Sequence, residues 1–145
     1  MIAFGAIVPL VWLLWLVLTE WVPMFPLNDL RPDNRRQRLV AAAINYPFPL
    51  VIAAGVVVHR PWSLTVSLTL CALTVLGHVS SWWLPYFGRS TAAQRAAYRR
   101  DYARTTKILP TRGHTVVIDV QHMVVVVGLL TVAMLTSTVI ATVRT

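Results

Sequence analysis

Charged residues are missing from four long segments of the chain, which alternate with short polar connections. The uncharged segments are residues 1–19, 39–58, 61–88 and 120–143. Each is about as long as the roughly 20-residue helix that crosses a hydrocarbon core of ~30 Å. The pattern therefore predicts an all-α integral membrane protein, a single domain over residues 1–145 with four antiparallel transmembrane helices. These helices are expected at about residues 2–24, 39–58, 63–87 and 116–142.

The composition supports this class. Apolar residue types make up 57% of the 145 residues, and charged types make up only 12%. A soluble domain carries about 25% charged residues, so this chain has too little polar surface to cover a soluble globule. The composition argues against a soluble enzyme, a disordered regulator or a nucleic-acid-binding module, in spite of the net charge of +8. The one cysteine, Cys71, lies in the third apolar segment and is expected to be a packing residue.

The basic residues predict the orientation in the membrane. Two loops, residues 25–38 and 88–115, contain 11 of the 13 Lys and Arg residues, and the other two are Arg60 and Arg144. Because loops rich in Lys and Arg stay in the cytosol, we expect both loops to be cytosolic and both termini to lie outside, with the protein in the inner (cytoplasmic) cell membrane. The same charges are expected to contact anionic lipids of the inner leaflet, so they require no nucleic-acid partner.

The second cytosolic loop is predicted to contain a short interfacial helix at about residues 91–105. Ser90 or Thr91 is a suitable N-cap. Several residues of this helix share one face, and the tyrosines among them suit headgroup depth. The members of this face are Thr91, Arg95, Tyr98, Tyr102 and Thr105.

A proline pair interrupts the second predicted helix. Pro47 and Pro49 each lack a backbone N–H and tend to break or kink a helix. Such prolines are tolerated in membrane spans where neighbouring groups satisfy the freed carbonyls. We expect a distorted half-turn here, with Asn45 capping the free backbone groups. The distortion is interpreted either as a packing kink or as the wall of a cavity.

Five polar residues lie inside the predicted spans, all toward the cytosolic ends. They are Glu20, Asn45, His78, Asp119 and His122. At 1.5 Å per residue, their depths from those ends are about 6, 9, 13, 5 and 9 Å in the same order. Ionisable groups in hydrocarbon are costly and mark candidate functional sites. Because the five residues come from four helices at similar depth, we expect them to converge on one pocket in the cytosolic half.

The expected pocket has the residue types for proton transfer on a lipophilic molecule. Asp119 and His122 are three residues apart and share a helix face, so the carboxylate is expected to orient the imidazole as a general acid or base. His78 or Glu20 is the expected proton partner. Aromatic faces would stabilise a developing cation, and a loop arginine would bind a phosphate. The expected substrate-binding residues are Asn45, Tyr46, Trp21, Trp82, Trp83, Tyr86 and Arg112.

These residues predict an isomerase- or cyclase-type membrane enzyme with an isoprenoid or lipid-like substrate and no cofactor. Two other classes stay open. One is a metal or haem protein, because two carboxylates and two imidazoles suit a divalent metal and two histidines suit a haem. Its ligands would come from His78, His122, Asp119 and Glu20. The other is a non-enzymatic protein, either an accessory subunit of a partner membrane protein or a small homo-oligomeric proton-coupled transporter.

Overall fold

The computed structural model describes residues 2–31 and 34–143, and these residues form helices and loops without a strand. The elements are α1 (Ile2–Trp21), α2 (Arg35–Asn45), α3 (Pro47–Val58), α4 (Pro61–His78), a π-helical turn (Val79–Trp83), α5 (Leu84–Tyr86), α6 (Ala92–Asp101) and α7 (Val120–Val143). Within the described ranges, four stretches are long and apolar enough to cross a membrane: α1, α2–α3, α4–α5 and α7. The predicted all-α class with four candidate spans is thereby confirmed. Arg144 lies outside the described residues.

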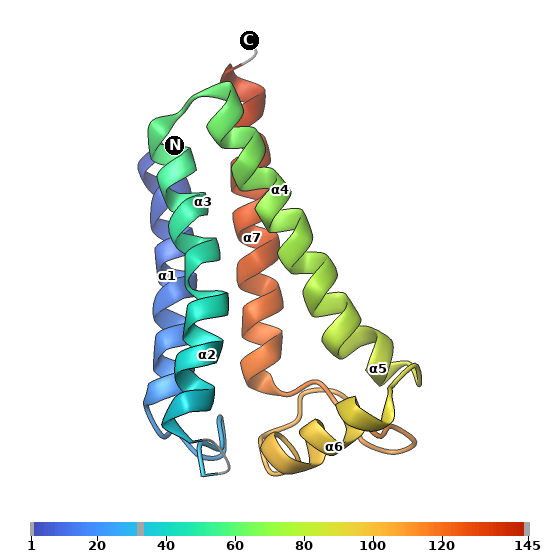
Figure 1. The fold of residues 1–145 in the computed structure, drawn as a ribbon. Helices are drawn as coiled ribbons and strands as arrows, with labels where there is room; N and C mark the ends of the chain where they lie inside the picture. Colours follow the sequence, from blue (N-terminus) through green and yellow to red (C-terminus); the bar gives the residue numbers. More distant parts are fainter. Residues whose placement is uncertain (1, 32–33, 144–145) are drawn as a thin grey trace.

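The four stretches form a bundle in which each packs against two others. α1 packs on α3 and α7, and α4 packs on the same two helices, so α1 and α4 lie diagonally opposite each other. Figure 1 shows α4 diverging from α7 toward the end of the bundle that carries α6, here called the α6 end. Mid-bundle, the core consists of Trp12, Ile52, Cys71, Leu129 and Val132. Large apolar side chains are also exposed on the outer faces of the helices, a feature typical of helices that contact lipid.

The first helix is shorter than predicted, and the side chain of Asn28 caps its C-terminal end. α1 ends at Trp21 rather than at residue 24. Asn28 Nδ2 donates to the carbonyls of Thr19 and Val22, at 2.8 Å each, and Asn28 Oδ1 accepts from Met24 N at 2.7 Å. One buried side chain therefore satisfies backbone groups that the helix end leaves free.

The second span begins earlier than predicted and is divided where the prolines predict. Asn34 and Gln37 form a reciprocal capping box, each side chain accepting from the other's backbone N at 2.9 Å. The division between α2 and α3 falls at Tyr46. The expected cap by Asn45 is wrong: α3 begins without a side-chain cap among the described residues, and Asn45 Nδ2 lies 3.5 Å from Glu20 Oε1 instead.

The third span contains a π-helical turn that the sequence pattern does not predict. The turn covers Val79–Trp83 and connects α4 to α5 without a break in the helix. A π turn accommodates one more residue than an α turn and often occurs at functional sites. It changes the direction of the side chains that follow His78 relative to a regular α-helix.

The connection between the third and fourth spans is less helical than predicted. Thr91 is the N-cap of α6, as expected, and Gln94 completes a capping box. α6 ends at Asp101, however, and the chain then turns and runs back along the bundle end, where Val120 N donates to the carbonyl of Thr106 at 3.0 Å. α7 therefore begins at Val120 rather than at residue 116.

Candidate functional site

A cavity of about 710 Å³, partly open to the outside, lies between the helices and the loops of the α6 end. Apolar side chains form much of its inner wall, and Arg38 of α2 and Arg100 of α6 also line it. Five of the predicted site residues line this cavity: Glu20, Asn45, His78, Trp82 and His122. The structure thus brings polar groups from all four spans to one cavity.

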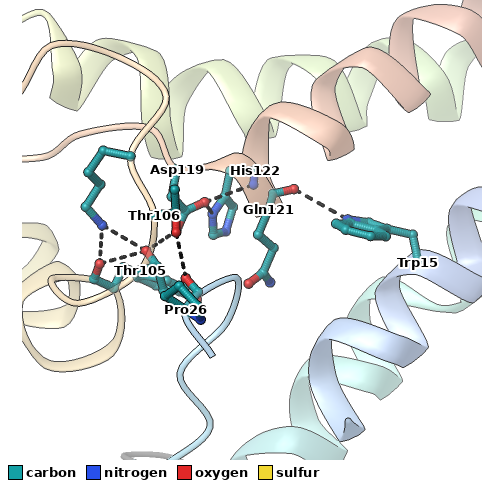
Figure 2. Close-up of polar contacts among 9 residues, drawn as sticks. Trp15, Pro26, Thr105, Thr106, Asp119, Gln121 and His122 are labelled. Carbon is teal, nitrogen blue, oxygen red and sulfur yellow. Dashed lines mark hydrogen bonds and ion pairs between the residues drawn. The ribbon is translucent and has the colours of Figure 1, made fainter. Parts of the chain in front are cut away.

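Asp119 holds the imidazole of His122 in place. Asp119 Oδ1 lies 2.6 Å from His122 Nδ1 and also accepts from the backbone N of His122 at 3.0 Å. The second bond is an N-cap interaction, because Asp119 immediately precedes α7. A carboxylate only accepts hydrogen bonds, so Nδ1 carries the proton and the neutral ring has its lone pair on Nε2. Figure 2 shows this pair at the start of α7, with Thr105 beside the carboxylate.

The loop after α6 binds the second oxygen of Asp119. Thr105 Oγ1 donates to Asp119 Oδ2 at 2.6 Å, and Lys107 Nζ donates to Thr105 Oγ1 at 2.8 Å and to the carbonyl of Tyr102. Burial alone raises the pKa of Asp119, but hydrogen bonds from His122 and Thr105 outweigh it and lower that pKa below the ordinary 3.8. Burial lowers the pKa of Lys107, and the charge of Asp119 opposes this. The buried carboxyl group is therefore ionised at neutral pH.

Trp82 and Tyr102 pack on the ring of His122. Trp82 stacks on it with centroids 3.5 Å apart at 29°, and Tyr102 meets it edge-on at 4.9 Å and 87°. Trp82 comes from the π-helical turn, and Tyr102 directly follows α6. The ring of His122 therefore lies between the Asp119 carboxylate and the face of an indole.

His78 approaches the same region from α4. Its side chain is only 8% exposed, and its ring centroid lies 6.4 Å from that of His122. His78 Nε2 is buried without a hydrogen-bond partner in the described part of the chain. A buried polar atom left unpaired costs about 1–3 kcal/mol, and a hydrogen-bond partner in the cavity would recover that cost.

Glu20 and Asn45 line the cavity from α1 and α2. Their side chains lie 3.5 Å apart, from Asn45 Nδ2 to Glu20 Oε1. Beside them, Trp21 Nε1 donates to the hydroxyl of Tyr46 at 2.9 Å. Tyr46 and Trp21, both predicted to bind substrate, therefore join α1 to the start of α3 and do not line the cavity.

Trp83, Tyr86 and Arg112 also lie away from the cavity lining. Trp83 packs on Phe87, with ring centroids 6.3 Å apart, and Tyr86 stacks on His114 at 3.9 Å and 9°. Arg112 is exposed in the loop before α7. The structure gives these three predicted substrate-binding residues no place at the cavity.

Several residues at the site are not among the predicted site residues, including Trp12, Tyr102 and Thr105. Tyr102 and Thr105 do lie on the face predicted for the interfacial helix. The sequence therefore grouped these two residues, but it did not indicate their contacts with His122 and Asp119. Trp12 carries no such signal, because a tryptophan deep in an apolar helix is equally typical of simple packing.

The donors predicted for a metal do not form one cluster. Across residues 2–31 and 34–143, no three His, Cys, Asp or Glu side chains lie close enough together to hold a single ion. What remains of the predicted ligand set is the pair of imidazoles, His78 and His122.

Fold and cavity together define an all-helical protein with four candidate membrane spans and an internal polar site. Comparisons of the chain with protein-family models, curated proteins and solved structures found no match. The geometry of the cavity is therefore the basis for assigning a function.

Proposed function

We propose that the protein is a membrane-embedded enzyme that moves a proton on a lipophilic, isoprenoid or lipid-like substrate. The observation that carries this proposal is the pair formed by Asp119 and His122, 2.6 Å apart, with the imidazole on the cavity wall. A carboxylate that orients an imidazole is the usual arrangement for general acid–base catalysis. The unpaired buried nitrogen of His78 supplies a second proton-transfer group.

The proposed reaction is an isomerisation. His122 Nε2 removes a proton from a C–H bond beside a double bond, and the double bond shifts as a proton is added to a second carbon. One C–H bond breaks and another forms, so the reaction needs no oxidant or reductant. The Asp119 carboxylate stabilises the imidazolium, and Glu20 or His78 exchanges the second proton.

The proposed setting is the inner cell membrane, with the α6 end facing the cytosol. The 25–38 and 88–115 loops at this end hold 11 of the 13 basic residues, which supports a cytosolic location and contact with anionic lipids. A lipophilic substrate would then enter from the membrane and present its polar part toward the cytosolic half.

Solvent-isotope incorporation tests the proposed reaction even though the substrate is unidentified. The protein in nanodiscs is incubated in D₂O with a total lipid extract from the cells that express it, and lipids are analysed by high-resolution mass spectrometry. We expect one lipid species to gain deuterium with the wild type. Because a general base contributes about 10²–10⁴-fold, His122→Gln should slow this gain by at least about a hundredfold.

A histidine at the far end of the bundle provides the control. His59 lies between α3 and α4 with φ of +52°, a conformation that asparagine tolerates. His59→Asn should leave deuterium incorporation unchanged. If no lipid gains deuterium with the wild type, the acid–base function is wrong and a non-enzymatic role is favoured.

The second candidate is bis-imidazole binding of haem or another metal, and it rests on the spacing of the two rings. Two imidazoles bound to one metal at ~2.0 Å would have their ring centres roughly 6 Å apart, and those of His78 and His122 are 6.4 Å apart. The absorption spectrum and metal content of the purified protein test this. A stoichiometric haem or metal that is lost in both His78→Ala and His122→Ala would favour this candidate.

A further inference from the structure

Trp12 and His78 place two buried polar atoms at the cavity that nothing in the described part of the bundle satisfies. Trp12 is 5% exposed and His78 is 8% exposed. Over the residues that the structure describes, neither Trp12 Nε1 nor His78 Nε2 has a hydrogen-bond partner. Both residues line the cavity. Because buried polar atoms are nearly always hydrogen-bonded, two unpaired ones on the same cavity indicate that a ligand binds between them.

The two residues lie at similar depth on opposite walls. Trp12 is nine residues before the end of α1 at Trp21, and His78 is eight residues before the end of α5 at Tyr86. At 1.5 Å per residue, both lie about 12–14 Å from the α6 end. Because α1 and α4 are diagonal in the bundle, their side chains approach the cavity from opposite directions.

The apolar residues packed around Trp12 favour a neutral ligand atom at this depth. Phe48, Val125 and Leu129 line the same cavity. Trp12 itself is held against α7, where a Cβ on Gly128 would lie 3.6 Å from Trp12 Cδ1. A mid-membrane apolar wall disfavours a charged group, and an indole N–H only donates. The ligand atom between the two residues must therefore be an acceptor, most simply an uncharged oxygen on an apolar molecule.

We propose that Trp12 and His78 hydrogen-bond the carbonyl oxygen of a lipophilic unsaturated ketone in the cavity. Trp12 Nε1 donates to this oxygen, and His78 donates from a protonated Nε2. The inference rests on the proposed function in one respect, because it makes the ketone the substrate of His122. The ring of His122 lies 6.4 Å from that of His78, which leaves room for the carbon next to the carbonyl.

With the ketone bound in this way, every proton and electron pair of the isomerisation is accounted for. His122 Nε2 takes a proton from the carbon beside the carbonyl, and the electron pair of that C–H bond moves onto the carbonyl oxygen. The two donors stabilise the resulting enolate, as donors aimed at a developing oxyanion do in other enzymes. A second proton, delivered by Glu20, then adds to a carbon further along the conjugated system as the carbonyl re-forms, and the proton on His122 returns to Glu20 by exchange with solvent.

A matched pair of probes tests the carbonyl site in the wild type. We would compare the binding of a twelve-carbon conjugated ketone, labelled with ¹³C at the carbonyl, and the twelve-carbon alkene without the oxygen, by calorimetry in nanodiscs. Infrared spectra would report the carbonyl band. The ketone should bind about tenfold or more tightly than the alkene, and its carbonyl band should shift to lower wavenumber on binding. Equal affinity for the two probes, or an unshifted band, would overturn the proposal.

Variants of two tryptophans on α1 provide the second test. Trp12→Phe keeps the aromatic ring and removes the donor, so it should weaken ketone binding about tenfold and reduce the band shift. Trp15→Phe is the control, because Trp15 Nε1 donates to the carbonyl of Gln121 at 3.4 Å and Trp15 does not line the cavity. Figure 2 shows this bond. Unchanged ketone binding in Trp12→Phe would contradict the proposal.

The two proposals fail separately. Ketone binding with a shifted band, in the absence of any deuterium incorporation, would contradict the acid–base function and support the carbonyl site. Deuterium incorporation that depends on His122, found only in a lipid without a ketone group, would support the function and overturn the carbonyl site.

Discussion

At the residue scale, Asp119 connects three parts of the molecule. Its carboxylate caps α7, holds the Nδ1 of His122 and accepts from Thr105 in the loop after α6. The side chain is fully buried, and a buried carboxylate is tolerated only when donors surround it. The same contacts that orient the imidazole therefore also tie the loop to the fourth span.

Replacing Asp119 separates its structural role from its charge. Asparagine is as good an N-cap as aspartate, so Asp119→Asn should lower the free energy of unfolding by only about 1 kcal/mol while abolishing deuterium incorporation. Asp119→Ala removes the cap and leaves the buried Thr105 hydroxyl and the Lys107 ammonium without the carboxylate. It should therefore lower the free energy of unfolding by roughly 3 kcal/mol or more. Unfolding in mixed micelles measures both. Equal losses of stability in the two variants would contradict the role of the cap.

The lowered pKa of Asp119 also predicts an acid-dependent loss of stability. A carboxyl group whose pKa is lower in the folded state contributes its stability above the ordinary value of 3.8 and loses it as the pH falls from 3.8 toward the lowered pKa. The melting temperature of the wild type should therefore fall below about pH 4 more steeply than that of Asp119→Asn. A hydrogen bond from Arg31 also lowers the pKa of Asp29. Because Asp29 is present in both proteins, its contribution to the pH dependence is the same in each and does not affect the comparison. Parallel pH profiles would contradict this prediction.

At the scale of elements, the close approach of α3 and α4 depends on small residues. Ser63 Oγ donates to the carbonyl of Gly55 at 2.8 Å, and Ser67 Oγ lies 3.3 Å from the carbonyl of Ile52. A Cβ on Gly55 would lie 2.1 Å from Ser67 Oγ and 2.8 Å from the backbone oxygen of Ser63. Small residues at such a crossing let two membrane helices approach closely.

Alanine at two helical glycines tests this packing. Gly55→Ala should destabilise the protein by about 1–3 kcal/mol, because the two helices must separate to accommodate the methyl group. Gly77→Ala is the matched control, since a Cβ there meets nothing within 4 Å, and it should leave stability unchanged or raise it by up to about 1 kcal/mol. Thermal stability measured by size-exclusion chromatography compares them. Equal melting temperatures would show that the helices do not approach this closely.

At the scale of the whole molecule, charge is distributed unevenly between the two ends. The loops at the α6 end hold most of the basic residues, and the turn between α3 and α4 at the other end holds Arg60. This asymmetry, together with the apolar outer faces, is what the proposed orientation in the membrane depends on.

Cysteine labelling tests this orientation. In a Cys71→Ala background, Arg112→Cys and Arg60→Cys each place one thiol at an exposed position on opposite ends of the bundle. In intact cells a membrane-impermeant maleimide should label the Arg60→Cys protein alone, and permeabilisation should make the Arg112→Cys protein reactive. Labelling of Arg112→Cys in intact cells would reverse the proposed topology.

Features that depend on local chemistry could be predicted from the amino-acid sequence. The length of each uncharged segment predicted the four candidate spans, the proline pair predicted the division at Tyr46, and Thr91 was one of the two caps predicted for α6. Each of these depends on residues within a few positions of one another, where helix geometry leaves little choice. The spacing of Asp119 and His122 likewise predicted the contact between their side chains, although Asp119 precedes α7 as its N-cap and does not lie on its face.

Contacts across the bundle, in contrast, are set by tertiary packing. The contact of Thr105 with Asp119 depends on a loop that runs back along the bundle end, and the choice of Trp82 rather than Trp83 for His122 depends on the π-helical turn. The positions of Trp12 and His78 on opposite walls depend on which helices are neighbours. Periodicity records which face of a helix is apolar, but the partners of that face are decided by packing between segments far apart in the chain.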